Sequence, residues 1–103
     1  MSAINSEIAK TILAQMGGMA RLSGFIGAKN FCVVEKGVTF RWSGKSKNKT
    51  NFLKVTLNGS DLYDVEFCRL YAMKFTVIET FENLFFDQLI KTFEEQTGLY
   101  LTL

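Results

Sequence analysis

The chain has 103 residues, of which 48% are hydrophobic and 14% aromatic, and it contains no proline and no histidine. This length and composition predict one domain, residues 1–103, around a single hydrophobic core, and they exclude an intrinsically disordered protein. The net charge is +2, but residues 29–54 hold seven cations against one carboxylate, and residues 55–103 hold three against eight. This polarity suits a protein that steers a partner or associates with itself, and it excludes a uniformly basic DNA-binding domain.

Residues 3–16 are predicted to form an amphipathic helix, because their apolar side chains recur every three or four positions. Two glycines then supply the left-handed backbone that commonly ends a helix. The segment 19–29 is punctuated by further glycines, and we interpret it as a loop or as a short edge strand around Phe25 and Ile26.

From residue 30 the apolar period changes to two, which predicts strands. The expected strands are 30–34, 38–42, 53–57, 63–71 and 73–79, the last being an extension of the fourth or a fifth strand. In the second of these, Val38, Phe40 and Trp42 share one face. Turns are expected at Lys36-Gly37 and at residues 58–61.

Residues 81–97 are predicted to form a second helix, with Thr80 as its N-cap and Gly98 just past its end. The apolar tail 99–103 is expected to dock as a strand or to pack on the sheet. The fold class is therefore α+β: an antiparallel sheet of four or five meandering strands, flanked by an N-terminal and a C-terminal helix packed on one face.

The N-terminal residues 1–8 lack the basic start and apolar run of a signal peptide, and no apolar run approaches the roughly 18 residues of a membrane span. A cytoplasmic protein with no membrane partner is expected. Cys32 and Cys68 lie in apolar runs, and in that compartment both are most simply reduced core residues.

The sequence contains few candidate catalytic residues, because a chain without histidine has no Ser-His-Asp triad and no histidine metal ligand. We expect no enzyme and no cofactor. Asp64 and Glu66, with Asp61 nearby, have the spacing of a divalent-metal nuclease on one strand face. A solvated sheet face gives the same pattern, with Lys54 or Lys74 across the strands to neutralise it, and is the simpler interpretation.

A cluster of basic residues with one aromatic ring surrounds the polar loop 43–51. Its members are Arg41, Trp42, Lys45, Lys47, Lys49 and Lys54. Cations on a loop beside a stackable ring are typical of proteins that grip single-stranded nucleic acid. In the competing interpretation the lysines only keep the loop soluble, and Trp42 lies in the core beside Phe40.

Several aromatic residues exceed what the inward-facing stripes need. They are Phe25, Phe52, Tyr71, Phe86 and Tyr100. Surplus aromatic residues on a small domain indicate an interface with a protein partner or with a second copy. Packing beneath the C-terminal tail is the alternative.

Five segments of the chain carry a family resemblance. They are Met16-Gly17-Gly18, Gly27-Ala28-Lys29-Asn30-Phe31, Lys54-Val55-Thr56-Leu57-Asn58, Asp61-x-Tyr63-Asp64-Val65-Glu66-Phe67 and Thr97-Gly98-Leu99-Tyr100. Over nearly its full length the chain resembles a family of short, functionally uncharacterised proteins of tailed phages and prophages. Ile26, where that pattern has threonine, and the loop 43–51 depart from it. The resemblance implies a phage accessory protein in the host cytoplasm and assigns no functional residue.

The expected function is therefore stoichiometric binding of a host or phage protein, most concretely inhibition of a host or defence-system protein. A homodimer fits the same features. Single-stranded nucleic-acid binding through the basic loop is the alternative, and a divalent-metal nuclease is the third hypothesis.

Overall fold

The computed structural model describes residues 3–42 and 46–101. The elements in chain order are α1 (Ala3–Gln15), α2 (Met19–Ile26), β1 (Lys29–Val34), β2 (Gly37–Arg41), η1 (Lys47–Lys49), β3 (Phe52–Leu57), β4 (Tyr63–Tyr71), β5 (Lys74–Leu84), η2 (Phe86–Gln88) and α3 (Leu89–Thr97). The two η elements are single turns of 3-10 helix. Within the described ranges, no helix is long and apolar enough to cross a membrane.

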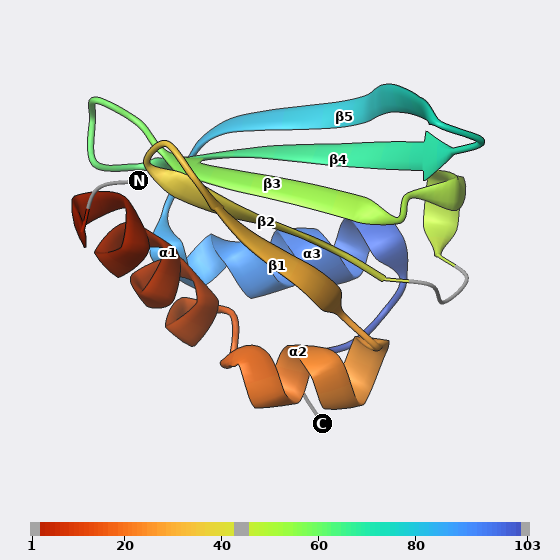
Figure 1. Cartoon of the computed structure of the whole chain (residues 1–103), viewed down its shortest axis with the longest axis horizontal. Coiled ribbons are helices and arrows are strands. Elements are labelled where there is room, and N and C mark those ends of the chain that lie inside the picture. Colours follow the sequence, from red (N-terminus) through yellow and green to blue (C-terminus); the bar gives the residue numbers. More distant parts are fainter. Residues whose placement is uncertain (1–2, 43–45, 102–103) are drawn as a thin grey trace.

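The strands form one antiparallel sheet in the order β1-β2-β3-β4-β5, so each strand pairs with its neighbours in the sequence. This confirms the predicted meander and makes the last strand a fifth one. The three helices lie together on one face of the sheet and leave the other face uncovered (Figure 1). The α+β fold class is as predicted, with one helix more than the sequence indicated.

The core fills the space between the sheet and the helices, and aromatic rings from both layers meet in it. The ring of Phe93 on α3 lies 5.2 Å from Trp42, 6.3 Å from Phe67 and 6.5 Å from Phe40, measured between ring centroids. Burial of one such side chain contributes roughly 1.5–3 kcal/mol, so this cluster anchors α3 to the sheet. Leu101 is buried as well, and its backbone nitrogen donates to Glu94 Oε2 on α3 at 2.8 Å. The described part of the C-terminal tail therefore packs beside α3, and the predicted docking as a strand is wrong.

Helix α2 replaces the loop or edge strand that the sequence predicted for residues 19–29 around Phe25 and Ile26. Leu22 and Ile26 stand four positions apart and are both buried, whereas Phe25 is exposed. Gly27 ends the helix in the left-handed conformation, with φ of 70°. The glycines therefore lie inside and after a helix, and the apolar spacing of three and four was the better signal.

The C-terminal helix is shorter than the predicted range 81–97, because β5 runs on through Thr80 and Phe81, and α3 begins only at Leu89. Thr80 is therefore not an N-cap. The ring of Phe81 packs edge-on against Phe67 of β4 at 5.9 Å. The register of β4 and β5 shifts at two places, and the extra residues disturb the period of two along β5. The apolar residues of this segment are therefore spaced irregularly, as in an amphipathic helix, which explains the predicted helix start at residue 81.

The first hairpin turns one residue earlier than predicted at Lys36-Gly37. Val34 pairs with Gly37, so Glu35 and Lys36 form the turn, and Lys36 takes the positive φ of 56°. Gly37 belongs to β2, where an added Cβ would overlap the Val55 carbonyl oxygen. The glycine is thus needed for close approach of two strands. The turn predicted after β3 is confirmed.

The two cysteines differ in environment, which corrects the expectation that both are core residues. Cys68 on β4 is buried, whereas Cys32 on the edge strand β1 is exposed. The pKa of the Cys68 thiol is raised to about 11, mainly by burial and also by the Glu66 carboxylate, while the Lys54 ammonium acts in the opposite direction. Cys68 therefore remains a neutral thiol near neutral pH.

Candidate functional site

The structure does not bring the residues of the predicted nucleic-acid site together. Trp42, the aromatic residue of that site, is buried. Trp42 is 1% exposed, and its ring packs against Phe40 and Phe93. Such a ring cannot stack on a base, so the interpretation that placed Trp42 in the core is confirmed. Two buried donors here, Trp42 Nε1 and Arg41 Nε, have no hydrogen-bond partner among the described residues.

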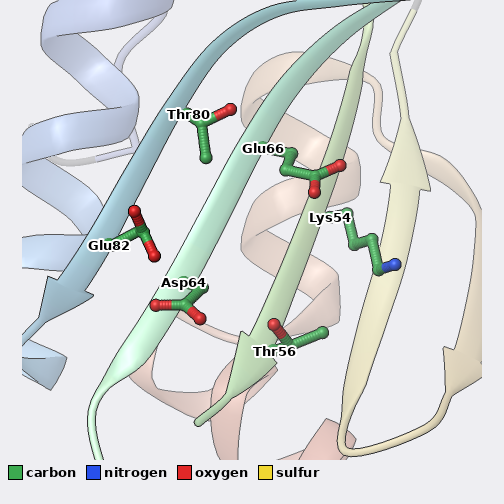
Figure 2. Close-up of a pocket in the computed structure, with 6 residues that line it drawn as sticks. All are labelled: Lys54, Thr56, Asp64, Glu66, Thr80 and Glu82. Atoms are coloured by element: carbon green, nitrogen blue, oxygen red, sulfur yellow. The ribbon is translucent and has the colours of Figure 1, made fainter.

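Two of the predicted basic residues are engaged elsewhere. Lys47 Nζ donates to the backbone oxygen of Glu95 at 3.4 Å, at the C-terminal end of α3. A cation is favourable there, because the last carbonyls of a helix carry partial negative charge. Lys54 lies on the uncovered sheet face, directly across from Glu66 (Figure 2). Lys45 lies outside the described residues.

Arg41 and Lys49 stay together and line an open groove of about 860 Å³, where β2 ends and β3 begins. The other residues lining this groove are Trp42, Ser46, Thr50, Asn51, Arg69, Leu70, Tyr71 and Ala72. Arg69 adds a third cation, which the sequence did not single out, and its guanidinium lies 4.8 Å from the centre of the Tyr71 ring. None of the described residues that line the groove is a carboxylate. We call it the cationic groove.

Asn51 shapes the cationic groove by continuing the pairing of β3 with β4 through its side chain. Asn51 Nδ2 donates to the Leu70 oxygen at 2.8 Å, and the Leu70 nitrogen donates to Asn51 Oδ1 at 2.7 Å. The Asn51 backbone also accepts from the Trp42 nitrogen at 3.1 Å and donates to the Cys68 oxygen at 3.0 Å. One residue thus holds the ends of β2 and β4 together.

A second hollow of about 230 Å³ adjoins the cationic groove at the β4–β5 turn. It is lined by Arg69, Tyr71, Lys74 and Thr76. Arg69 and Tyr71 line both hollows, so the positive surface continues from the groove to Lys74.

The predicted acidic pair lies in a different pocket, of about 170 Å³, on the uncovered sheet face (Figure 2). Its lining residues are Lys54, Thr56, Asp64, Glu66, Thr80 and Glu82. Asp64 and Glu66 share the face, as predicted. Asp64 Oδ1 accepts from Asn58 Nδ2 at 3.0 Å and from the Asn83 nitrogen at 3.1 Å, so this oxygen stabilises a turn and a bulge.

The third acidic residue, Asp61, stands apart from that pocket in the turn after β3, with a positive φ of 58°. Within residues 3–42 and 46–101, no group of three or more histidine, cysteine, aspartate or glutamate side chains could hold a metal ion. Lys54 stands across from Glu66 on this face, as the simpler interpretation of a solvated sheet face expected, but Lys74 lines a different hollow, and the pocket keeps three carboxylates against one cation.

The five predicted interface aromatics are spread over the molecule and form no single surface. They belong to α2, β3, β4, η2 and the segment after α3, in the order Phe25, Phe52, Tyr71, Phe86 and Tyr100. All except Phe52 are exposed; Phe52 is half-buried, with its ring 5.3 Å from that of Phe75. Of the five, only Phe52 belongs to a larger apolar surface, through its contact with Phe75 on β5.

Strand β5 carries the larger apolar surface, and the sequence analysis did not identify this strand as a candidate site. It forms an edge of the sheet and has one neighbour there, β4 (Figure 1). Nine of its eleven residues are exposed. Phe75, Val77 and Ile78 expose 51%, 48% and 36% of their surface. The period-two run was visible in the sequence, but its position at an uncovered edge was not.

The first half of β5 continues an apolar area of the uncovered sheet face. Phe75 pairs with Leu70 and Val77 with Cys68, while Cys68 pairs on its other side with Phe52. We call these five residues the apolar strip. The carboxylate-lined pocket follows along the same face, so β5 borders an apolar and an acidic area in turn.

Comparisons of the chain with protein-family models, with curated proteins and with solved structures found no match.

Proposed function

We propose that this protein is a non-enzymatic binding module that holds one protein partner stoichiometrically, and that β5 is where the partner docks. One observation carries the proposal: an edge strand of eleven residues that exposes the apolar side chains of Phe75, Val77 and Ile78. Proteins commonly blunt such edges with proline, short strands or inward charges, because an open edge recruits other strands. β5 has two register shifts but no proline, and Phe75 and Val77 precede the first of them.

The mode of binding is strand addition, in which an extended segment of the partner pairs with the free side of β5. Main-chain hydrogen bonds supply the attraction, and alternate side chains supply the specificity. Because paired residues share a face, the partner's side chains next to Phe75 and Val77 extend the apolar strip. The partner's side chains next to Glu82 border the carboxylate-lined pocket.

This geometry favours a particular chemistry for the proposed partner segment. It carries large apolar side chains at alternate positions, followed by a basic residue that faces Glu82 and Asp64. The resemblance to phage and prophage proteins supports a host or defence-system protein as the source of this segment, and inhibition as the outcome of occupying it.

The test replaces Val77 with lysine, which introduces a positive charge into the apolar strip on β5. The wild-type protein is used to capture partners from host lysate, and the captured protein is purified and mixed with it. We expect a complex of 1:1 stoichiometry by light scattering after gel filtration, and at least tenfold weaker binding by Val77→Lys. That factor corresponds to about 1.4 kcal/mol, the order expected for one well-placed interface side chain.

The control is Tyr100→Lys, which adds the same charge at an exposed apolar position outside β5. Circular dichroism checks that both variants are folded. Equal binding by Val77→Lys and wild type, or equal weakening by the two variants, contradicts docking on β5. Wild-type protein that elutes as a dimer which Val77→Lys dissociates would mean that the strand pairs with its own copy instead.

A further inference from the structure

We infer that the cationic groove, together with the adjoining hollow at Lys74, binds the sugar-phosphate backbone of single-stranded nucleic acid. The site is distinct from the apolar strip and does not depend on the function proposed above. It retains Arg41 and Lys49 from the basic cluster seen in the sequence and replaces Trp42, which is buried, with Arg69 and Tyr71.

The charge of this surface is of one sign and is not neutralised within the described part of the chain. Arg41, Lys49 and Arg69 line the groove, and Lys74 lines the hollow next to it. No described carboxylate lines either one, and none of the four cations forms a salt bridge with a described residue. Unpaired cations that converge on a hollow concentrate positive potential there and attract a polyanion.

The shape favours a chain of phosphates over a single anion. The groove of about 860 Å³ and the hollow of about 230 Å³ share two lining residues, so the charged surface is elongated. Its cations come from β2, η1, β4 and β5, at the end of the sheet near the β4–β5 turn. A backbone with one charge per nucleotide can contact such a series of cations in succession.

The surface also provides what a base requires. Tyr71 exposes 66% of its surface, and the Arg69 guanidinium lies against its ring. Since every base has a π-face, stacking on Tyr71 gives binding with little sequence preference.

The experiment is a fluorescence-anisotropy titration of a labelled twelve-nucleotide oligothymidylate at several salt concentrations. We expect wild-type binding that weakens with salt, and about tenfold weaker binding at low salt by the double variant Lys49→Gln/Arg69→Gln. Each lost phosphate contact lowers the slope of log K against log salt by about 0.7, so the double variant should lose about 1.4 from the slope. Tyr71→Ala should weaken binding about fivefold or more with an unchanged slope.

The matched control is Lys10→Gln/Lys91→Gln, which removes the same net charge from exposed positions on α1 and α3. It should bind within about twofold of wild type if the groove is the site. The inference is overturned if wild type does not bind at low salt, or if the control loses as much affinity and slope as the groove variant. It is also overturned if inorganic phosphate displaces the oligonucleotide at equal phosphate concentration, because the site then takes a free anion.

Discussion

Replacing Asn51 with alanine should destabilise the fold through a defined pair of hydrogen bonds. The Asn51 side chain donates to the Leu70 oxygen at 2.8 Å and accepts from the Leu70 nitrogen at 2.7 Å. One such bond contributes about 0.5–1.5 kcal/mol net, and a polar group left unpaired in a half-buried place loses somewhat more. The expected decrease in the free energy of unfolding is therefore about 2–3 kcal/mol.

Urea unfolding followed by circular dichroism measures this decrease. With a slope of about 1–3 kcal/mol per molar, the midpoint should fall by about 0.7–3 M. Asn51→Asp should destabilise the fold at least as much, because a carboxylate still accepts from the Leu70 nitrogen but places an acceptor oxygen against the Leu70 carbonyl oxygen. Gln96→Ala on α3 is the control and should stay within about 0.5 kcal/mol of wild type. An Asn51→Ala midpoint equal to that of wild type would refute the role assigned to this side chain.

Three further predictions concern the core, the first hairpin and the thiols. Phe93→Ala should lower the free energy of unfolding by about 3–5 kcal/mol in the same assay, because it empties the centre of the aromatic cluster. Gly37→Ala should destabilise by at least about 1–3 kcal/mol, since its Cβ overlaps a carbonyl oxygen of β3, whereas Gly59→Ala, with open space around it, should change stability little. Native protein at pH 8 should react with a thiol reagent once, at Cys32, and a second time, at Cys68, only after unfolding. Because the folded pKa of Cys68 is raised from 9.0 to about 11, its contribution to stability is present below pH 9 and is lost as the pH rises toward 11. Between pH 9 and pH 11 the urea midpoint of a Cys68→Ala variant should fall less than that of wild type. Two fast-reacting thiols in the native protein would contradict the burial of Cys68.

Local patterns in the sequence were sufficient for much of the fold. The apolar spacing of residues 3–16 identified α1, and the alternation of Val38, Phe40 and Trp42 placed three side chains in the core. The turn at 58–61 followed from its residue types. These features depend on interactions within a few positions of one another, which a linear reading captures.

The errors occurred where long-range contacts decide the structure. Residues 81–84 had helix-like spacing, but β4 offered them backbone partners, so they became strand. Burial of Leu22 and Ile26 favoured a helix in a segment where glycines suggested a loop. At β5 strand pairing outweighed the local signal, whereas at α2 the apolar spacing was a better local signal than the glycines, and packing of Leu22 and Ile26 stabilises the helix.

The sequence by itself determined the fold class, the order of the strands and the presence of a basic cluster and surplus aromatics. Only the tertiary structure decided which of these residues act together. It buried Trp42, directed Lys47 to α3 and Lys54 to Glu66, and brought Arg69 to Arg41 and Lys49. It also left β5 at an uncovered edge. The reason is physical: a side chain's type is local, whereas its exposure and neighbours depend on which strands pair and which face the helices cover.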